Sequence, residues 1–165
     1  MTNFPTNDIV IADANDADLL ATLIAAAFQD VAARFGLTRD NCPGHTSFIT
    51  AGEVRRGMGF GNQYFLAVAG EVPCGVVAVR QPKGGTGIVE KLAVLPDFRH
   101  HGLGRALMEA ALTELKRSDA TAAEIGIIAE HSVLRAWYET LGFCAVRQVR
   151  YDHLPFAVLH LRKEI

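Results

Sequence analysis

The chain has 165 residues, half of them hydrophobic and 21% charged, with a formal net charge of −2. This length suits a single globular domain, expected over residues 1–165, and the composition excludes intrinsic disorder and fibrous repeats. The near-neutral charge offers no basic surface to nucleic acid or to an anionic membrane, so we expect neither as a partner. Because the opening residues lack a basic segment followed by an apolar one and no apolar run could span a bilayer, we expect a cytoplasmic protein.

The N-terminal part of the sequence predicts a strand followed by two helices. Residues 9–12, IVIA, are typical of a short strand, and Asn15 or Asp16 can cap the helix that follows. Apolar residues then recur at intervals of three and four, which predicts one helix with a single buried stripe, ended by Gly36. The stripe consists of Leu19, Leu20, Leu23, Ile24, Ala27, Phe28, Val31 and Phe35. Residues 47–56 are expected to form the second, shorter helix.

The segment between these two helices, LTRDNCPGHT, predicts an exposed loop and contains the first of three cysteines. Cys42, Cys74 and Cys144 are odd in number and widely separated, which argues against a disulfide framework. Cys42 stands three residues before His45, a spacing that would fit half of a zinc site. Since no second pair of ligands accompanies these two residues, we expect no metal.

Strands dominate the rest of the chain. Glycine and proline at tight turns separate three segments that predict an antiparallel meander, residues 64–69, 76–81 and 88–94. A helix is expected from the amphipathic pattern that begins near residue 103. The remaining elements are predicted as a buried strand over 123–129, a helix over 132–141 closed by Gly142, and two strands over 144–151 and 156–163.

Residues 99–105, RHHGLGR, join the third meander strand to the amphipathic helix. The first N–H groups of a helix lack partners and carry partial positive charge, so an anion is favoured there. Gly102 and Gly104 would let the backbone approach a phosphate closely, and Arg99 and Arg105 add charge. A pyrophosphate would fit, although a glycine-rich turn without a ligand explains this loop equally well. Leu107 breaks the dinucleotide pattern G-x-G-x-x-G, and no P-loop sequence occurs.

Two segments, residues 92–112 and 123–143, resemble the GNAT N-acetyltransferase superfamily. In that superfamily a strand ending in Val-x-Pro leads into (R/Q)-x-x-G-x-(G/A), which Arg99, Gly102 and Gly104 match. The later segment is similar to the strand and helix that end in Tyr-Glu-x-x-Gly-Phe. The order of the predicted elements is also that of the superfamily, and the resemblance is weakest before residue 64.

The resemblance implies an α/β (α+β) GNAT fold with a mixed, mostly antiparallel sheet of about seven strands and about four helices. It further implies that the sheet is splayed where acetyl-CoA, the cosubstrate, binds. The backbone of Leu92, Ala93 and Val94 would then pair with the pantetheine arm. The residues expected to hold the pyrophosphate are Arg99, His100, His101, Gly102, Leu103, Gly104 and Arg105.

One position departs from the superfamily pattern. His131 stands seven residues before Tyr138, where family members often have an asparagine that contacts the pantetheine region. His131 either replaces that asparagine as a donor or only caps the following helix together with Ser132.

Attack of an amine on a thioester needs a group that removes the ammonium proton. Glu90 is the first candidate, because a regular strand would place it on the same face as Leu92 and Val94 and because comparable family members use a strand glutamate in this role. A polar strand residue facing solvent is the alternative interpretation. His45, His131 and His153 are the other candidate bases.

The departing thiolate also needs a proton, and Tyr138 is the candidate acid. A phenol with a pKa of about 10 keeps its proton at pH 7 and can donate it to a thiolate. Ordinary packing of an aromatic residue on a helix is the alternative.

The acceptor amine is expected between RFGLTRDNCPGHTSF, which follows the first helix, and RYDHLPF, between the last strands. Both segments mix charges of either sign, so we expect a small-molecule primary amine, with a protein or peptide N-terminus or a lysine as the alternative. A CoA-binding sensor module without transfer activity is a hypothesis of another class. The resemblance also implies a homodimer through the late strands, although no feature of this sequence indicates one.

Overall fold

The computed structural model describes residues 7–165. Residues 1–6 lie outside the described residues. They belong to the expected single domain and to the N-terminal stretch on which the expectation of a cytoplasmic protein depends. The strands are β1 (Asn7–Ala12), β2 (Gln63–Ala69), β3 (Val72–Lys83), β4 (Thr86–Val94), β5 (Ala122–Ile128), β6 (Cys144–Arg150) and β7 (Ala157–Glu164). The helices are α1 (Ala17–Ala27), α2 (Gln29–Arg34), α3 (Ala51–Gly59), α4 (Leu103–Arg117) and α5 (Ser132–Thr140).

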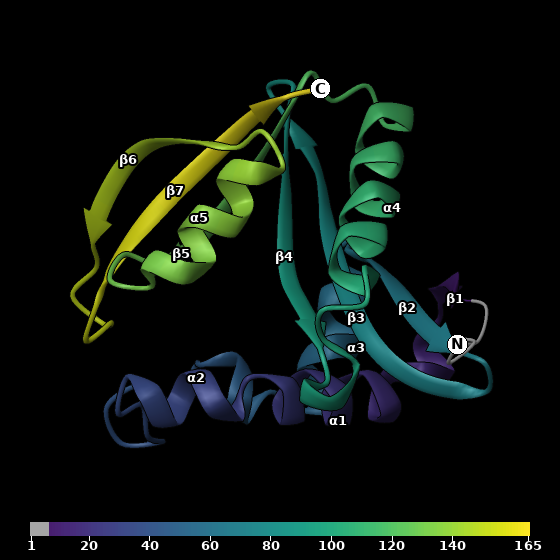
Figure 1. Cartoon of the computed structure of the whole chain (residues 1–165), viewed down its shortest axis with the longest axis horizontal. Helices are drawn as coiled ribbons and strands as arrows, with labels where there is room; N and C mark the ends of the chain where they lie inside the picture. The colour runs from purple at the N-terminus through teal and green to yellow at the C-terminus, as the bar shows by residue number, and fades with distance from the viewer. Residues whose placement is uncertain (1–6) are drawn as a thin grey trace.

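All seven described strands form one sheet in the order β1-β2-β3-β4-β5-β7-β6. Neighbouring strands are antiparallel except β4 and β5, which are parallel and pair only between residues 86–88 and 122–124. Beyond these residues the two strands diverge, as Figure 1 shows. The prediction of a mixed, mostly antiparallel sheet that splays between two central strands is therefore confirmed.

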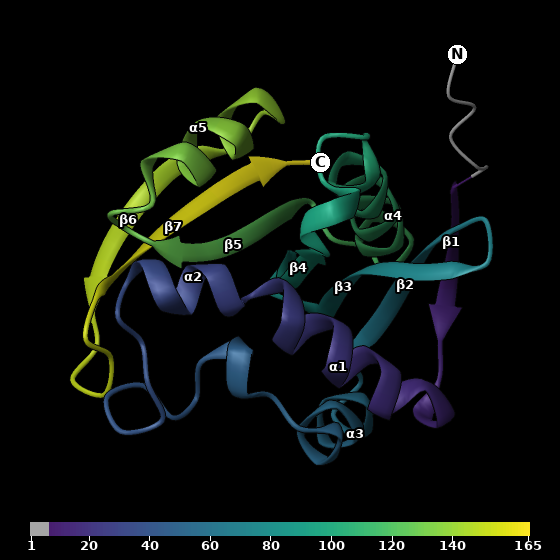
Figure 2. The ribbon, with the colours of Figure 1, turned by 60° about the horizontal axis from the view of Figure 1, so that its bottom comes forward.

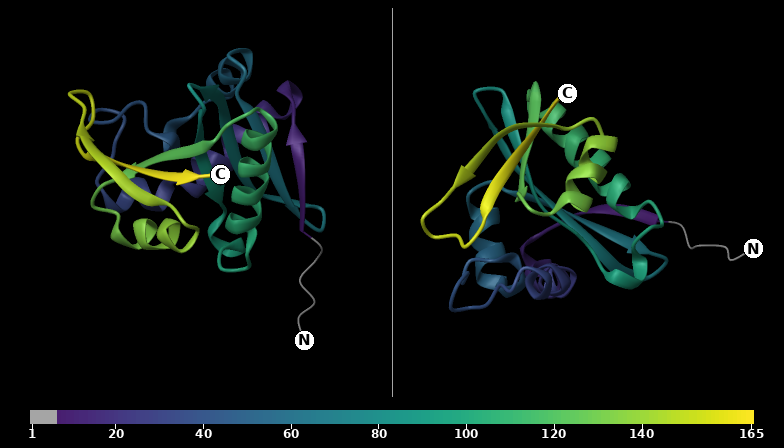
Figure 3. Two further views of the ribbon diagram at one scale, coloured as in Figure 1. Left: turned by 90° about the horizontal axis from the view of Figure 1, so that it is seen from above. Right: turned by 60° about the vertical axis from the view of Figure 1, so that its left-hand side comes forward.

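Helices cover both faces of the sheet (Figures 2 and 3). Apolar side chains of α4 and α5 pack on one face in a core that includes Leu107, Leu115 and Phe143. Those of α1 and α3 pack on the other face in a second core, which includes Leu20 and Val54. None of the helices within residues 7–165 is long and apolar enough to cross a membrane.

The first predicted helix is broken at Phe28 into α1 and α2. The break coincides with a lost helical hydrogen bond, because the carbonyl of Ala27 accepts from the Arg99 guanidinium at 2.8 Å. The Val31 N–H, which a continuous helix would direct to that carbonyl, instead donates to the Asp30 carboxylate at 2.9 Å. The prediction of one continuous helix was wrong because its apolar stripe cannot reveal a partner 72 residues away in the chain.

The second predicted helix, residues 47–56, begins later than expected. The structure has a short 3-10 turn at Thr46–Phe48 and then α3, whose N-terminus is closed by a capping box between Thr50 and Glu53. The Thr50 side chain accepts from the Glu53 N–H, and the Glu53 carboxylate accepts from the Thr50 N–H at 2.8 Å. This reciprocal pair sets the helix start at Ala51, four residues beyond the predicted one.

Strand β4 contains a bulge at Lys91, whose φ of 55° lies in the left-handed region. Ala78 of β3 faces Glu90, but Val76 faces Ala93, so β4 carries one extra residue between these pairs. Val89, Leu92 and Val94 consequently all pack against the core under α4. Glu90 lies on the opposite face from Val89, so the prediction that Glu90 shares a face with Leu92 and Val94 was wrong.

Candidate functional site

The divergence of β4 and β5 opens a groove made of two adjoining cavities. The cavity at the vertex, where the strands still pair, has a volume of about 870 Å³ and includes Ile88 and Glu124 in its wall. The other, of about 650 Å³, lies at the start of α4 and is lined by Gly102 and Arg105. Leu92 and several further residues line both cavities, so the two form one groove with a vertex end and a loop end.

At the loop end, the N-terminus of α4 has free backbone donors. Gly102 occupies the N-cap position with a φ of 83°, and no side chain caps the helix within the described residues. The first backbone bond of the helix runs from the Ala106 N–H to the Gly102 carbonyl, which leaves the N–H groups before Ala106 available to an anion. An added Cβ at Gly102 would meet nothing within 4 Å, so this surface is open.

Arg99 is committed to the protein itself. Its guanidinium forms an ion pair with Asp30 at 2.5 Å, and its Nε donates to the Val94 carbonyl at 2.9 Å. The hydrogen bond and charge of Arg99 lower the pKa of Asp30 below its usual value. Arg99 therefore ties the loop to the α1–α2 junction, and its charge is balanced before any phosphate arrives. The remaining cationic side chain of the loop at this groove is Arg105.

Three residues expected at the cofactor do not line the groove with their side chains. Leu103 is 2% exposed and belongs to the core under α4, whereas Ala93 packs into the core on the opposite face. His101 is exposed and is absent from the lining of both cavities, unlike His100, which lines the loop end. Leu103 and Ala93 can contribute only through their backbone groups.

His131 lines both cavities and also caps α5. Its Nδ1 accepts from the Leu134 N–H at 3.3 Å, so the ring proton is on Nε2. Burial lowers the pKa of His131 below its usual value, and the nearby Arg34 acts in the same direction. A neutral ring with Nε2–H can cap the helix and donate a hydrogen bond into the groove, so the two sequence-based interpretations are compatible.

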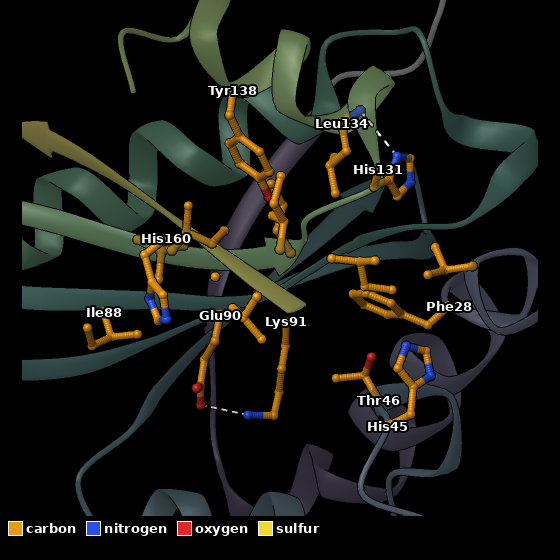
Figure 4. Close-up of a pocket in the computed structure, with 18 of the residues that line it drawn as sticks. Phe28, His45, Thr46, Ile88, Glu90, Lys91, His131, Leu134, Tyr138 and His160 are labelled. Carbon is orange, nitrogen blue, oxygen red and sulfur yellow. Dashed lines mark hydrogen bonds and ion pairs between the residues drawn. The ribbon is translucent and has the colours of Figure 1, made fainter. Parts of the chain in front are cut away.

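Tyr138 lies on the side of α5 that faces the sheet, and its hydroxyl points into the cavity at the vertex (Figure 4). The residue is 3% exposed, and its ring packs edge-on against Trp137 and Phe143. Burial raises the pKa of Tyr138, so the hydroxyl stays protonated throughout the neutral range. The residue therefore both packs in the core and presents a proton to the groove.

Glu90 also lines this cavity, but its carboxylate is already surrounded by donors. Oε1 accepts from Lys91 at 2.6 Å, as Figure 4 shows, and from Asn62 at 3.2 Å. Oε2 lies 3.3 Å from the Arg80 guanidinium. Two cations and an amide thus surround the Glu90 carboxylate.

A second polar cluster at the vertex was missed by the sequence analysis. Glu124 of β5 is 8% exposed and accepts hydrogen bonds on both oxygens from the Arg147 guanidinium of β6. Its Oε1 also lies 3.1 Å from Nδ1 of His160 on β7. The hydrogen bonds and charge of Arg147 lower the pKa of Glu124. All three residues line the cavity, and only the pairing of β5, β6 and β7 brings them together.

The two segments expected to frame the acceptor both reach the cavity at the vertex. His45 and Thr46 line it from the segment before α3, and His153 from the turn between β6 and β7. That turn packs beside the loop after α2, as Figure 2 shows, through Leu37 and Leu154. Within residues 7–165, no three His, Cys, Asp or Glu side chains are grouped so as to hold a metal ion.

A family model described as an acetyltransferase (GNAT) domain matches residues 60–145. Among curated proteins, the ribosomal protein bS18-alanine N-acetyltransferase of Escherichia coli (strain K12) is 38% identical over 52 residues. This segment is 32% of the present chain and 35% of the relative, so the chain matches about a third of the relative's length.

Solved structures are similar over almost the whole chain. A protein of the GNAT family from Desulfovibrio desulfuricans has a TM-score of 0.75 and 18% identity, covering 96% of this chain and 99% of that one. The PaiA N-acetyltransferase of Thermoplasma acidophilum, in complex with coenzyme A, has a TM-score of 0.73 and 14% identity, covering 97% and 99% of the two chains. At these identities the likeness establishes the fold alone.

Proposed function

Because the chain belongs to the GNAT acetyltransferase family, we propose that it transfers the acetyl group of acetyl-CoA to a primary amine. The observation that carries this proposal is the groove between β4 and β5, which has free helix donors at one end and a buried tyrosine hydroxyl aimed into the other. A similar fold binds coenzyme A in Thermoplasma acidophilum PaiA, which supports the choice of cosubstrate.

The residues of the groove fit acetyl-CoA. The N–H groups at the start of α4, with Arg105 beside them, would hold the pyrophosphate, and the absence of a side chain at Gly102 leaves room for it. Along β4, the backbone of residues 92–94 has no partner strand on the β5 side. Apart from the Val94 carbonyl, which accepts from Arg99, it is available to the pantetheine amides. When bound, acetyl-CoA supplies an activated acyl group to this groove.

Tyr138 is proposed as the acid of the reaction. Its raised pKa keeps the proton on the hydroxyl until a thiolate develops, and its rigid packing holds that hydroxyl at the vertex end. Glu90 remains a candidate for holding or deprotonating the acceptor nitrogen, since its carboxylate lines the same cavity. His131 would hold the cofactor arm through Nε2–H.

We propose a small-molecule amine as the acceptor. The vertex end is walled by mixed charges, with Arg80, Lys91 and Arg147 against Glu90 and Glu124, which suits a compact polar molecule better than a polycation. The E. coli relative is named as a ribosomal protein alanine N-acetyltransferase, and this favours a peptide N-terminus as the second candidate.

The test is release of CoA thiol from acetyl-CoA by the purified protein, with a panel of amines, amino acids and N-terminal peptides. We expect thiol release that depends on one class of amine. In Tyr138→Phe, kcat should fall about 100-fold while the affinity for acetyl-CoA stays unchanged, because a general acid acts only in the transition state. Calorimetry with acetyl-CoA measures the affinity of both proteins.

Two results would contradict this proposal in different ways. Unchanged turnover in Tyr138→Phe would remove the tyrosine from the mechanism while leaving the activity in place. Tight acetyl-CoA binding by the wild type without amine-dependent release across the panel would replace the enzyme with a CoA-binding sensor module.

A further inference from the structure

We propose that His160, oriented by Glu124, is the base that removes the proton from the acceptor's ammonium group. This inference rests on the proposed acetyl transfer and adds a catalytic residue that the sequence analysis did not consider. It assigns Glu90 to binding the acceptor amine rather than to deprotonating it.

The Glu124–His160 pair has the geometry of a base and its orienting carboxylate. Glu124 is held rigidly, because it is buried and both of its oxygens accept from Arg147. Nδ1 of His160 lies 3.1 Å from Glu124 Oε1 and 3.2 Å from a guanidinium nitrogen of Arg147. Because both donors of that guanidinium edge already bond to Glu124, we assign the carboxylate as the partner of Nδ1, with the ring proton on Nδ1. Nε2 is then the acceptor, which is the state a base requires.

Gly126 lets the imidazole lie over β5. It is the partner of His160 in the β5–β7 register, and it stands on the groove face two residues beyond Glu124. A Cβ at Gly126 would lie 3.0 Å from Val158 and 3.8 Å from the His160 ring. A side chain at this position would therefore crowd Val158 and the imidazole, whereas glycine lets His160 lie against β5.

His160 lies at the end of the groove where the reacting carbon is expected. Phosphates bound at the start of α4 and an arm along residues 92–94 direct the thioester toward the vertex, where β4 and β5 pair at Ile88 and Glu124. Figure 4 shows His160 beside Ile88 on that side of the cavity, across from Phe28 and His45. His45 and His131 lie farther toward α1 and α2 and have Nδ1 engaged as an acceptor from a backbone N–H.

Glu90 is less suited to take a proton. Lys91 and Asn62 contact one of its oxygens and Arg80 lies 3.3 Å from the other, so both oxygens already have partners within the protein. The carboxylate can still attract an ammonium group into the cavity.

His160 faces charged and titratable groups from several elements. Glu124 lies on β5, Arg147 on β6 and Tyr151 in the turn that follows β6, and Glu90 of β4 lies across the cavity.

The proton steps balance with the groups present. Nε2 of His160 takes one proton from the ammonium, and the neutral amine attacks the thioester carbon. As the C–S bond breaks, the sulfur takes the Tyr138 proton, and the second proton of the nitrogen returns to the Tyr138 oxygen. The products are the amide, the thiol and one proton on His160 that passes to solvent. Tyr151, whose hydroxyl is 3.3 Å from Nε2, occupies the position that the ammonium would take.

The kinetic test compares His160→Gln with Arg162→Gln on the amine found active. Arg162 is a matched control, because it lies two residues along β7 on the same face and is ion-paired with Glu164, but it is outside the groove. We expect kcat/KM for the amine to fall about 100-fold in His160→Gln, with acetyl-CoA affinity unchanged, and to stay within about twofold in Arg162→Gln. Imidazole should restore activity to His160→Ala.

The pH profile and Tyr151→Phe complete the test. His160→Gln should lose the acidic limb of the profile of kcat/KM, whereas Glu90→Gln should keep it and raise KM for the amine. Tyr151→Phe should remain active, since the amine replaces its hydroxyl. Three results would each overturn the assignment. The first is near-normal activity of His160→Gln, and the second is loss of the acidic limb in Glu90→Gln instead. The third is a loss of activity in Tyr151→Phe as large as that in His160→Gln.

A measurement on the protein alone separates this inference from the proposed function. The 15N chemical shifts of the neutral His160 ring should show the proton on Nδ1. A proton on Nε2 would overturn the base assignment even if the enzyme is active. A wild type that transfers acetyl to no amine would overturn the proposed function, and this inference with it.

Discussion

The two ends of the groove are built in different ways. At the loop end, the groups proposed to hold the phosphates are mainly backbone N–H groups at the start of α4. At the vertex end they are side chains from four strands, with Glu90 on β4, Glu124 on β5, Arg147 on β6 and His160 on β7. The loop end therefore tolerates many side-chain changes outside its glycines, whereas the vertex end depends on each side chain and on the strand pairing.

The largest expected effect is at the loop end. Gly102→Glu should abolish acetyl-CoA binding, because it places a negative charge where the helix N-terminus would meet a phosphate and adds a side chain to an open surface. Calorimetry with acetyl-CoA measures the loss.

Gly84→Glu is the matched control for that substitution. Gly84 also has a positive φ, 58°, and open surroundings, but it lies in the turn between β3 and β4 outside the groove. Both variants should lose about 1–2 kcal/mol of stability from the left-handed backbone. Equal acetyl-CoA affinity in the two variants would show that the start of α4 does not hold the cofactor.

An effect of intermediate size is expected from a substitution at the vertex end, on the free energy of unfolding and on its pH dependence. Glu124→Gln leaves Arg147 without its carboxylate and should lower the free energy of unfolding at pH 7 by about 2 kcal/mol, less than for a fully buried pair because Arg147 is half exposed. Arg147 lowers the pKa of Glu124 in the folded state below the reference pKa of 4.5 for a free glutamate. The ion pair therefore contributes its full stability above pH 4.5, and this stability is lost as the pH falls through the folded-state pKa of Glu124.

Denaturant unfolding of both proteins between pH 7 and pH 3 checks this. The difference in unfolding free energy between wild type and Glu124→Gln should shrink below pH 4.5. A difference that stays constant over this range would mean that the ion pair does not stabilise the fold.

The smallest effect is expected behind Glu90. The Tyr64 hydroxyl is buried and has no hydrogen-bond partner within the described residues, and burial together with the Glu90 charge raises the pKa of Tyr64 to about 12. Tyr64→Phe removes an unsatisfied polar group and should stabilise the protein by about 1 kcal/mol. A fall in melting temperature would instead reveal a partner for this hydroxyl.

The sequence allowed the loop end to be predicted better than the vertex end for a physical reason. Residues that are close in the chain, such as Gly102 and Gly104, keep their spacing in any strand–loop–helix unit. Glu124, Arg147 and His160 meet only through the register of three strands, which no local pattern shows. Tyr138 could be singled out only because the motif around it resembles that of a family.

Two local features escaped prediction. Nothing in IVEKLAV distinguishes a regular strand from one with a bulge at Lys91, yet the bulge moves Glu90 to the other face of the sheet. The break at Phe28 depends on Arg99, which removes the Ala27 carbonyl from the helix. At Phe28, therefore, a tertiary contact overrides the local periodicity.

The contacts of Arg99 with Asp30 and with the Ala27 carbonyl at the α1–α2 junction have a consequence for engineering. Arg99 shapes the loop before α4, and through Asp30 and Ala27 it also holds the helix pair that lines the groove on the side of the proposed acceptor site. Exchanging residues 28–48 for those of another enzyme in order to change the acceptor would therefore disturb the cofactor loop as well. A successful graft would have to carry a carboxylate at position 30, so the two binding functions are not separable modules in this chain.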